Sequence, residues 1–105
     1  MTLSTHVLDA ARGLPAPGVA VRLERRDGAA WTPLAEARTD ADGRVRAWPG
    51  VTDLAAGTYR LTFDTAHLSD FYPEVAVAFT IADADRHHHV PLLLSPFAYS
   101  TYRGS

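Results

Sequence analysis

Histidine is the residue type in this sequence best suited to chemistry near neutral pH. The five histidines comprise two isolated ones and a run of three: His6, His67, His87, His88 and His89. A neutral imidazole can act as a general base or bind a metal ion. If residues 87–95 form a strand, His87 and His89 lie on one face and His88 on the other. The run is therefore compatible with a metal site completed by His6 or His67, with a general base, or with a solvated strand end.

Arginine supplies the second candidate group. Arg44 directly follows the turn sequence Asp40-Ala41-Asp42-Gly43, and its guanidinium could stabilise developing negative charge. An arginine at such a turn usually pairs with a nearby carboxylate, and Arg46 on the same strand face competes for the same partners. The C-terminal residues 100–105 would ordinarily be a frayed tail. From the residues alone, Arg44 can be a stabilising group or a turn residue, and the tail can be part of a site or frayed.

Composition excludes several classes of function. The 105 residues carry a net charge of -2 with no basic cluster, which argues against nucleic-acid binding. No apolar run is long enough to span a membrane. Cysteine and lysine are both absent, which excludes disulfides, thiolate zinc sites and lysine chemistry. A length of 105 residues predicts a single domain over residues 1–105. The first residues lack the charged and apolar regions of a signal peptide, so we expect a cytoplasmic location.

The elements that must position these groups are strands. Apolar and polar residues alternate along most of the sequence, and Asp27-Gly28 and residues 40–43 are typical hairpin turns. The pattern predicts about eight short strands near residues 3–8, 19–24, 31–39, 44–47, 59–64, 75–81, 87–95 and 97–102. Pro91 marks an edge or a bulge. One short helix is expected over residues 65–70. The natural arrangement is a two-sheet antiparallel sandwich.

Three stretches carry a family resemblance from end to end. They are Leu3-Ser4-Thr5-His6-Val7-Leu8-Asp9 with Gly13 and Pro15-Ala16, the Thr39-Asp40-x-Asp42-Gly43-Arg44 turn, and His89-Val90-Pro91-Leu92-Leu93-Leu94-Ser95-Pro96 followed by Tyr99-Ser100-Thr101-Tyr102-Arg103-Gly104-Ser105. Together they resemble the 5-hydroxyisourate hydrolases, the transthyretin-related family of urate breakdown. The final Tyr-Arg-Gly-Ser is the hallmark that separates these hydrolases from transthyretin proper.

The resemblance implies an all-β, prealbumin/transthyretin-like sandwich of two four-stranded antiparallel sheets with one short helix. It also implies a homotetramer, built as a dimer of dimers, with active sites in the clefts between dimers. The implied reaction is hydrolysis of 5-hydroxyisourate to 2-oxo-4-hydroxy-4-carboxy-5-ureidoimidazoline, with no cofactor and no metal ion.

The family's functional residues match positions in this sequence. The resemblance implies that His6, Arg44, His89 and Ser105 are catalytic, and that His6, Arg44 and Tyr102 bind substrate. One histidine would activate water for attack on a ring carbonyl while Arg44 stabilises the charge. The C-terminal carboxylate, with a pKa of about 3.3–3.7, would orient a histidine or hold Arg44. His87 and His88 would be surface or supporting residues, and His67 structural.

Two other kinds of function are compatible with the same fold. A transthyretin-like carrier would bind a small molecule without any reaction and would need no catalytic histidine. A generic adhesion or carbohydrate-binding sandwich would give no reason for the matched motifs. We therefore expect a hydrolase.

Overall fold

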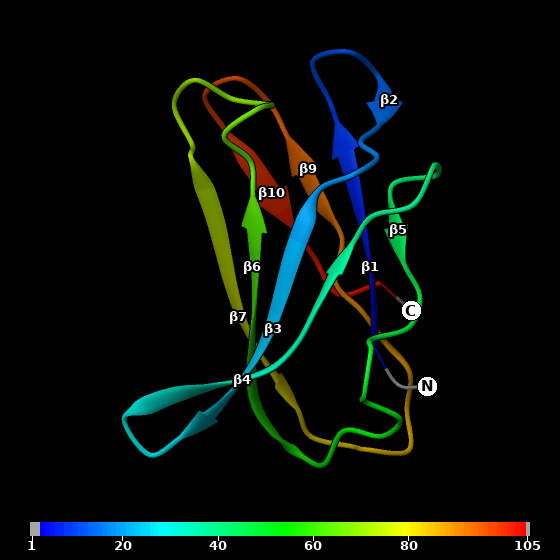
Figure 1. The fold of residues 1–105 in the computed structure, drawn as a ribbon, viewed down its shortest axis with the longest axis vertical. Coiled ribbons are helices and arrows are strands. Elements are labelled where there is room, and N and C mark those ends of the chain that lie inside the picture. Colours follow the sequence, from blue (N-terminus) through cyan, green and yellow to red (C-terminus); the bar gives the residue numbers. More distant parts are fainter. Residues whose placement is uncertain (1–2, 105) are drawn as a thin grey trace.

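The computed structural model describes residues 3–104, which fold into two facing layers of strands (Figure 1). Short polar turns separate the strands, as the alternating sequence predicts. The ten strands are β1 (Leu3–Asp9), β2 (Leu14–Pro15), β3 (Ala20–Asp27), β4 (Ala30–Arg38), β5 (Arg44–Val45), β6 (Gly57–Asp64), β7 (Glu74–Ile81), β8 (His88–His89), β9 (Leu92–Leu94) and β10 (Tyr99–Thr101).

The first sheet confirms the antiparallel prediction. Its four strands have the order β4-β3-β6-β7, and each pair of neighbours is antiparallel. The expected Asp27-Gly28 turn joins β3 to β4, with Gly28 at a φ of 63° that favours glycine. Alternate residues of β3 and β6, such as Leu23 and Leu61, are fully buried against the second sheet. This layer forms one wall of the core.

The second sheet is built around β1 and differs from the expected four antiparallel strands. Its main order is β10-β9-β1-β2, and β5 and β8 also pair with β1. β1 lies between β9 and β5 in Figure 1 and is parallel to both β8 and β9. Because the whole first sheet intervenes in the sequence between β1 and β8, no tight turn fixes their relative direction. The sheet is therefore mixed, with six strand segments.

The strand predicted for residues 87–95 is divided in two at Pro91. β8 ends at His89 and β9 begins at Leu92. Proline has no N–H to donate to a neighbouring strand, and here its carbonyl accepts a 2.7 Å hydrogen bond from the Thr101 hydroxyl. The prediction of an irregularity at this proline is confirmed.

The helix expected over residues 65–70 was wrong, since the segment is a hydrogen-bonded turn. The Thr65 carbonyl accepts from the amides of Leu68 and Ser69, but no further helical turn follows. Instead, the Ser69 hydroxyl accepts from the amides of Phe71 and Tyr72. Serine and threonine side chains that bond nearby backbone compete with a helix in this way, and one turn alone is costly to nucleate.

The core lies between the two sheets and is continuous. Seventeen buried apolar residues form one cluster: Leu3, Val7, Ala16, Val19, Val21, Leu23, Val45, Trp48, Leu54, Tyr59, Leu61, Phe63, Val75, Ile81, Val90, Leu92 and Leu94. Thr5 is also fully buried, and its hydroxyl donates to the Val90 carbonyl over 2.6 Å. Within residues 3–104 there is no helix of the length and apolarity that membrane crossing requires.

Candidate active site

The outward face of β1 carries the first site residues. Leu3, Thr5 and Val7 are buried in the core, so the intervening Ser4 and His6 project from the opposite face of the sheet. Both outward residues are partly exposed. The strand thereby places a hydroxyl and an imidazole two residues apart on a surface open to solvent.

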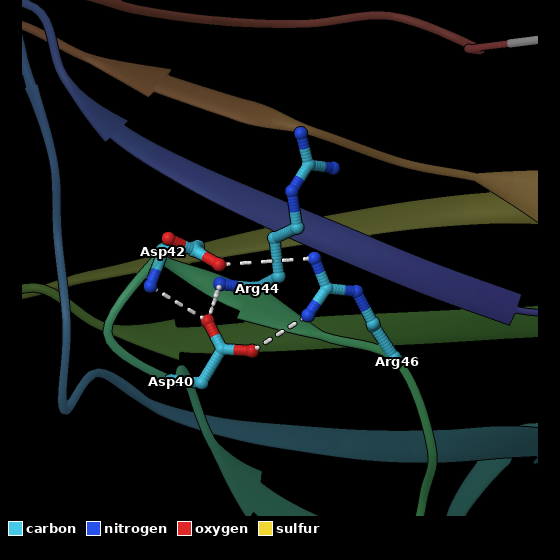
Figure 2. Close-up of polar contacts among 4 residues, drawn as sticks. All are labelled: Asp40, Asp42, Arg44 and Arg46. Carbon is cyan, nitrogen blue, oxygen red and sulfur yellow. Dashed lines mark hydrogen bonds and ion pairs between the residues drawn. The ribbon is translucent and has the colours of Figure 1, made fainter.

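Arg44 lies directly beside His6. The first residue of β5 pairs with β1 in antiparallel register, Arg44 opposite His6, which directs both side chains to the same face. The preceding turn sets this register. One oxygen of the Asp40 carboxylate accepts hydrogen bonds from the amides of Asp42 at 2.8 Å and Arg44 at 3.0 Å (Figure 2). Gly43 is required there, because it has a φ of 75° and an added Cβ would lie 2.6 Å from the Val7 carbonyl oxygen.

Arg46, and not Arg44, neutralises the carboxylates of this turn. Its guanidinium lies 3.1 Å from Asp40 Oδ2 and 3.9 Å from Asp42 Oδ2. Figure 2 shows the Arg44 side chain directed away from both carboxylates. No partner in an ion pair is found for Arg44 among residues 3–104. The turn-residue interpretation of Arg44 is therefore wrong for its side chain, and the guanidinium remains available beside His6.

The histidine run has its side chains on both faces of the sheet, as the alternation predicts. His88 is buried, with its Nδ1 atom 2.9 Å from the Arg86 carbonyl oxygen, so it is not a solvated strand end. His87 and His89 project outward to the same hydroxyl. Ser4 Oγ lies 2.8 Å from His87 Nε2 and 2.7 Å from His89 Nδ1. β8 thus brings His89 onto the face that carries His6.

The C-terminal tail lies against His89 at Gly104. The Gly104 amide donates a 2.7 Å hydrogen bond to the His89 carbonyl, and the two residues form a β-bridge. A Cβ at position 104 would lie 2.7 Å from Cδ2 of the His89 ring, so only glycine allows this approach. The frayed-tail interpretation is wrong as far as Gly104. Ser105 lies outside the described residues.

Tyr102 does not line the same hollow as His6 and Arg44 within one chain. Its side chain is 59% exposed and lines an apolar hollow with Phe79, His88 and Val90. The hollow beside the catalytic candidates is a different one, an open depression of about 370 Å³ lined by His6, Leu8, Pro15, Asp42 and Arg44. A depression of this size suits a small ligand.

Electrostatics couple the three groups. Burial lowers the pKa of His6, and the adjacent Arg44 guanidinium lowers it further, while the Asp42 carbonyl and the Asp40 and Asp42 carboxylates act in the opposite direction. Burial also lowers the pKa of His89, followed by the positive charge of Arg44 and then by His6 and His87. The Ser4 backbone raises it. Both shifts favour the neutral imidazole, which is the form that can accept a proton.

Metal coordination was the competing interpretation of the histidines. Across residues 3–104, no three His, Asp or Glu side chains are grouped so that they could hold a metal ion. The shared partner of His87 and His89 is instead a serine hydroxyl, which binds both rings by hydrogen bonds.

Comparison with known proteins agrees with this geometry. The family model described as HIUase/Transthyretin family matches residues 3–104. The chain belongs to this family. A 5-hydroxyisourate hydrolase of Caulobacter vibrioides is 51% identical, over 98% of this chain and 97% of its own length. A 5-hydroxyisourate hydrolase of Mus musculus is 45% identical, over 98% of this chain and 94% of its own length.

Solved structures of the HIUase/Transthyretin fold include both branches of the family. The Klebsiella pneumoniae 5-hydroxyisourate hydrolase matches with a TM-score of 0.83 and 40% identity over 100% of both chains. Sea bream transthyretin in complex with thyroxine matches with a TM-score of 0.90 and 32% identity, over 99% of this chain and 95% of that chain. The backbone fits both branches closely, so only the side chains of the site can distinguish hydrolase from carrier.

The sequence analysis did not identify Ser4 as a partner of the histidines, and it did not identify the close contact of Gly104 with His89. Ser4 lies two residues before His6 in the predicted strand, so the alternation of the strand could have placed both residues on one face. Its two histidine partners could not be inferred, because they depend on the parallel pairing of β1 with β8.

Proposed function

We propose that the chain hydrolyses 5-hydroxyisourate in the breakdown of urate. Support comes from the family and from relatives named as 5-hydroxyisourate hydrolases over nearly the whole chain. The strongest support is the Arg44 guanidinium, which has no ion pair within residues 3–104 and lies near two imidazoles whose pKa values are lowered. A carrier of apolar molecules would have no use for this arrangement of base and charge.

The proposed reaction needs no covalent intermediate. His6 and His89 act as base and acid: one removes a proton from water as the water oxygen attacks a ring carbonyl carbon. The carbonyl oxygen becomes negatively charged, and Arg44 stabilises it by charge and by hydrogen bonds. The carbon–nitrogen bond then breaks, and the departing nitrogen receives the proton that the base removed from water, delivered from that imidazole or through the second one. A general base contributes about 10²–10⁴-fold and an oxyanion donor about 10²–10³-fold.

We further propose that the site is completed in a homotetramer, a dimer of dimers. The open depression at His6 and the exposed Tyr102 support this assembly. A second subunit could cover the depression and contribute its own Tyr102 to it. Ser105, the final residue, stays a proposed catalytic residue through its carboxylate. The cytoplasmic location likewise stays a prediction.

The hydrolase proposal is tested by generating 5-hydroxyisourate from urate with uricase and following its absorbance. The chain should hasten the decay well beyond the spontaneous rate. A decay indistinguishable from that without the protein would refute the hydrolase and favour the carrier, for which thyroxine binding can be measured in the same sample. Gel filtration measures the proposed tetramer directly.

A further inference from the structure

One serine hydroxyl joins two histidine rings at the edge of the site. Ser4 pairs with His89 in the parallel register of β1 and β8, and its Oγ lies within 2.8 Å of both His87 Nε2 and His89 Nδ1. Neither distance leaves room for a water molecule in between. The mechanism proposed above uses His89 but assigns nothing to Ser4 or His87.

The chemistry of a hydroxyl couples the two rings. Serine has one proton to donate and two lone pairs that accept, whereas a neutral imidazole has one N–H and one bare nitrogen. Ser4 therefore cannot donate to both rings, and at least one of the two ring nitrogens must carry a proton directed at it. The tautomer of His89 consequently depends on whether His87 Nε2 donates a hydrogen bond to Ser4 Oγ or accepts one from it.

The tautomer decides what His89 can do. If Nδ1 carries the proton, Nε2 keeps its lone pair and can remove a proton from water. If Nδ1 is bare, neutral His89 carries its proton on Nε2 and cannot act as a base there. Gly104 packs against the Cδ2 edge of the ring, so the orientation of the ring is held while the proton position is set by Ser4.

The first of these states is the one that leaves His89 a base at Nε2. The Ser4 backbone raises the pKa of His89 and so favours a protonated ring, without selecting one of the two nitrogens. With the Nδ1–H of His89 donated toward Ser4, the hydroxyl proton of Ser4 can go to His87. The Asp42 backbone raises the pKa of His6 in the same way.

We propose that Ser4 and His87 are positioning residues: Ser4 accepts the Nδ1–H of His89 and donates its own proton to His87 Nε2, which presents Nε2 of His89 as the general base. This inference rests on the proposed function for its kinetic consequence, but not for the hydrogen-bond arrangement itself. In this arrangement His87 influences His89 through the Ser4 hydroxyl.

The first test removes and restores the hydroxyl. The tautomer of His89 is read from long-range ¹H–¹⁵N spectra of histidine-labelled protein, with assignment by the His89→Ala spectrum. Wild type should show the Nδ1–H form. Ser4→Ala should lose that form in favour of a mixture, and kcat should fall at least about tenfold with KM within about twofold, since a general base supplies about 10²–10⁴-fold. Ser4→Thr, which keeps a hydroxyl and suits a strand, should restore both measurements.

The second test changes only the hydrogen-bonding character of residue 87. In His87→Gln the side-chain carbonyl can still accept from Ser4, so His89 should keep its Nδ1–H form and kcat should stay within about threefold. In His87→Lys the side chain can only donate, so Ser4 should turn its proton to His89 Nδ1, and kcat should fall at least about tenfold. His67→Gln and His67→Lys are matched controls at an exposed turn histidine and should change neither measurement.

Two results would overturn the proposal: a Ser4→Ala spectrum with His89 still in the wild-type tautomer, or equal kcat values for the Gln and Lys variants at position 87. The spectra need no substrate. If the wild-type chain fails to hasten the decay of 5-hydroxyisourate, the hydrolase is refuted, while the tautomers of the Ser4 and His87 variants still decide the hydrogen-bond arrangement.

Discussion

Substitution of Gly104 by alanine should disable the site through a single contact. The added Cβ would lie 2.7 Å from Cδ2, 3.1 Å from Cβ and 3.2 Å from Cγ of His89, whereas ordinary carbon contacts begin near 3.5 Å. The ring and the tail must therefore separate by roughly 1 Å. Since a misplacement of about 1 Å can cost on the order of 10²-fold in rate, we expect kcat/KM to fall about 100-fold, or about 2.7 kcal/mol.

The assay is the accelerated decay of 5-hydroxyisourate, measured beside a thermal melt. Gly18→Ala is the control: it also adds a methyl group, but nothing lies within 4 Å of the new carbon, and Gly18 has a φ of 71°. That variant should lose stability through backbone strain and keep its activity. If Gly104→Ala retains kcat/KM within about twofold, the contact between Gly104 and His89 does not position the ring.

Further outcomes are expected at Arg44, at low pH, for the C-terminal tail and in the presence of a chelator. Arg44→Ala should lower kcat/KM at least about tenfold, whereas Arg46→Ala should lose only the exposed ion pairs with the turn; equal effects would remove Arg44 from the site. Because the pKa values of His6 and His89 lie below their ordinary value of 6.5, activity should persist as pH falls through 6.5 and decline only below it. Arg44→Ala should move that acid limb to higher pH, since it removes a positive charge; an unmoved limb would contradict the assigned cause. Deletion of residues 102–105 should abolish hydrolysis with little loss of stability, and a fully active truncation would exclude the tail from the site. Treatment with a chelator should leave the rate unchanged, and a rate restored by added metal would revive the metal interpretation of the histidines.

The sequence predicted the faces of the strands better than the partners of the side chains. Alternation placed His88 opposite to His87 and His89, and the structure confirms this, because one face of the sheet is buried. It could not distinguish Arg44 from Arg46. β5 ends at Val45, so Arg46 leaves the sheet and turns back to Asp40, which local spacing does not reveal.

The segment 65–70 shows the opposite kind of failure. Its composition is compatible with a helical turn, but the Thr65 and Ser69 hydroxyls bond the backbone nearby: Thr65 donates to the Tyr72 carbonyl, and Ser69 to the Pro96 carbonyl. The second of these contacts joins parts of the chain 27 residues apart. Long-range bonds of this kind are decided by the tertiary fold and cannot be read from a local window.

The central position of β1 ties catalysis to folding. The same seven residues supply one wall of the apolar interior and, on the reverse side, the hydroxyl and imidazole of the site. A slip of this strand by one residue would bury Ser4 and His6 and turn Leu3 and Val7 out to water. Molecules in which β1 pairs in the wrong register would therefore be inactive as well as unstable. The turnover number measured for a sample would then also report the fraction of molecules in which β1 has the correct register.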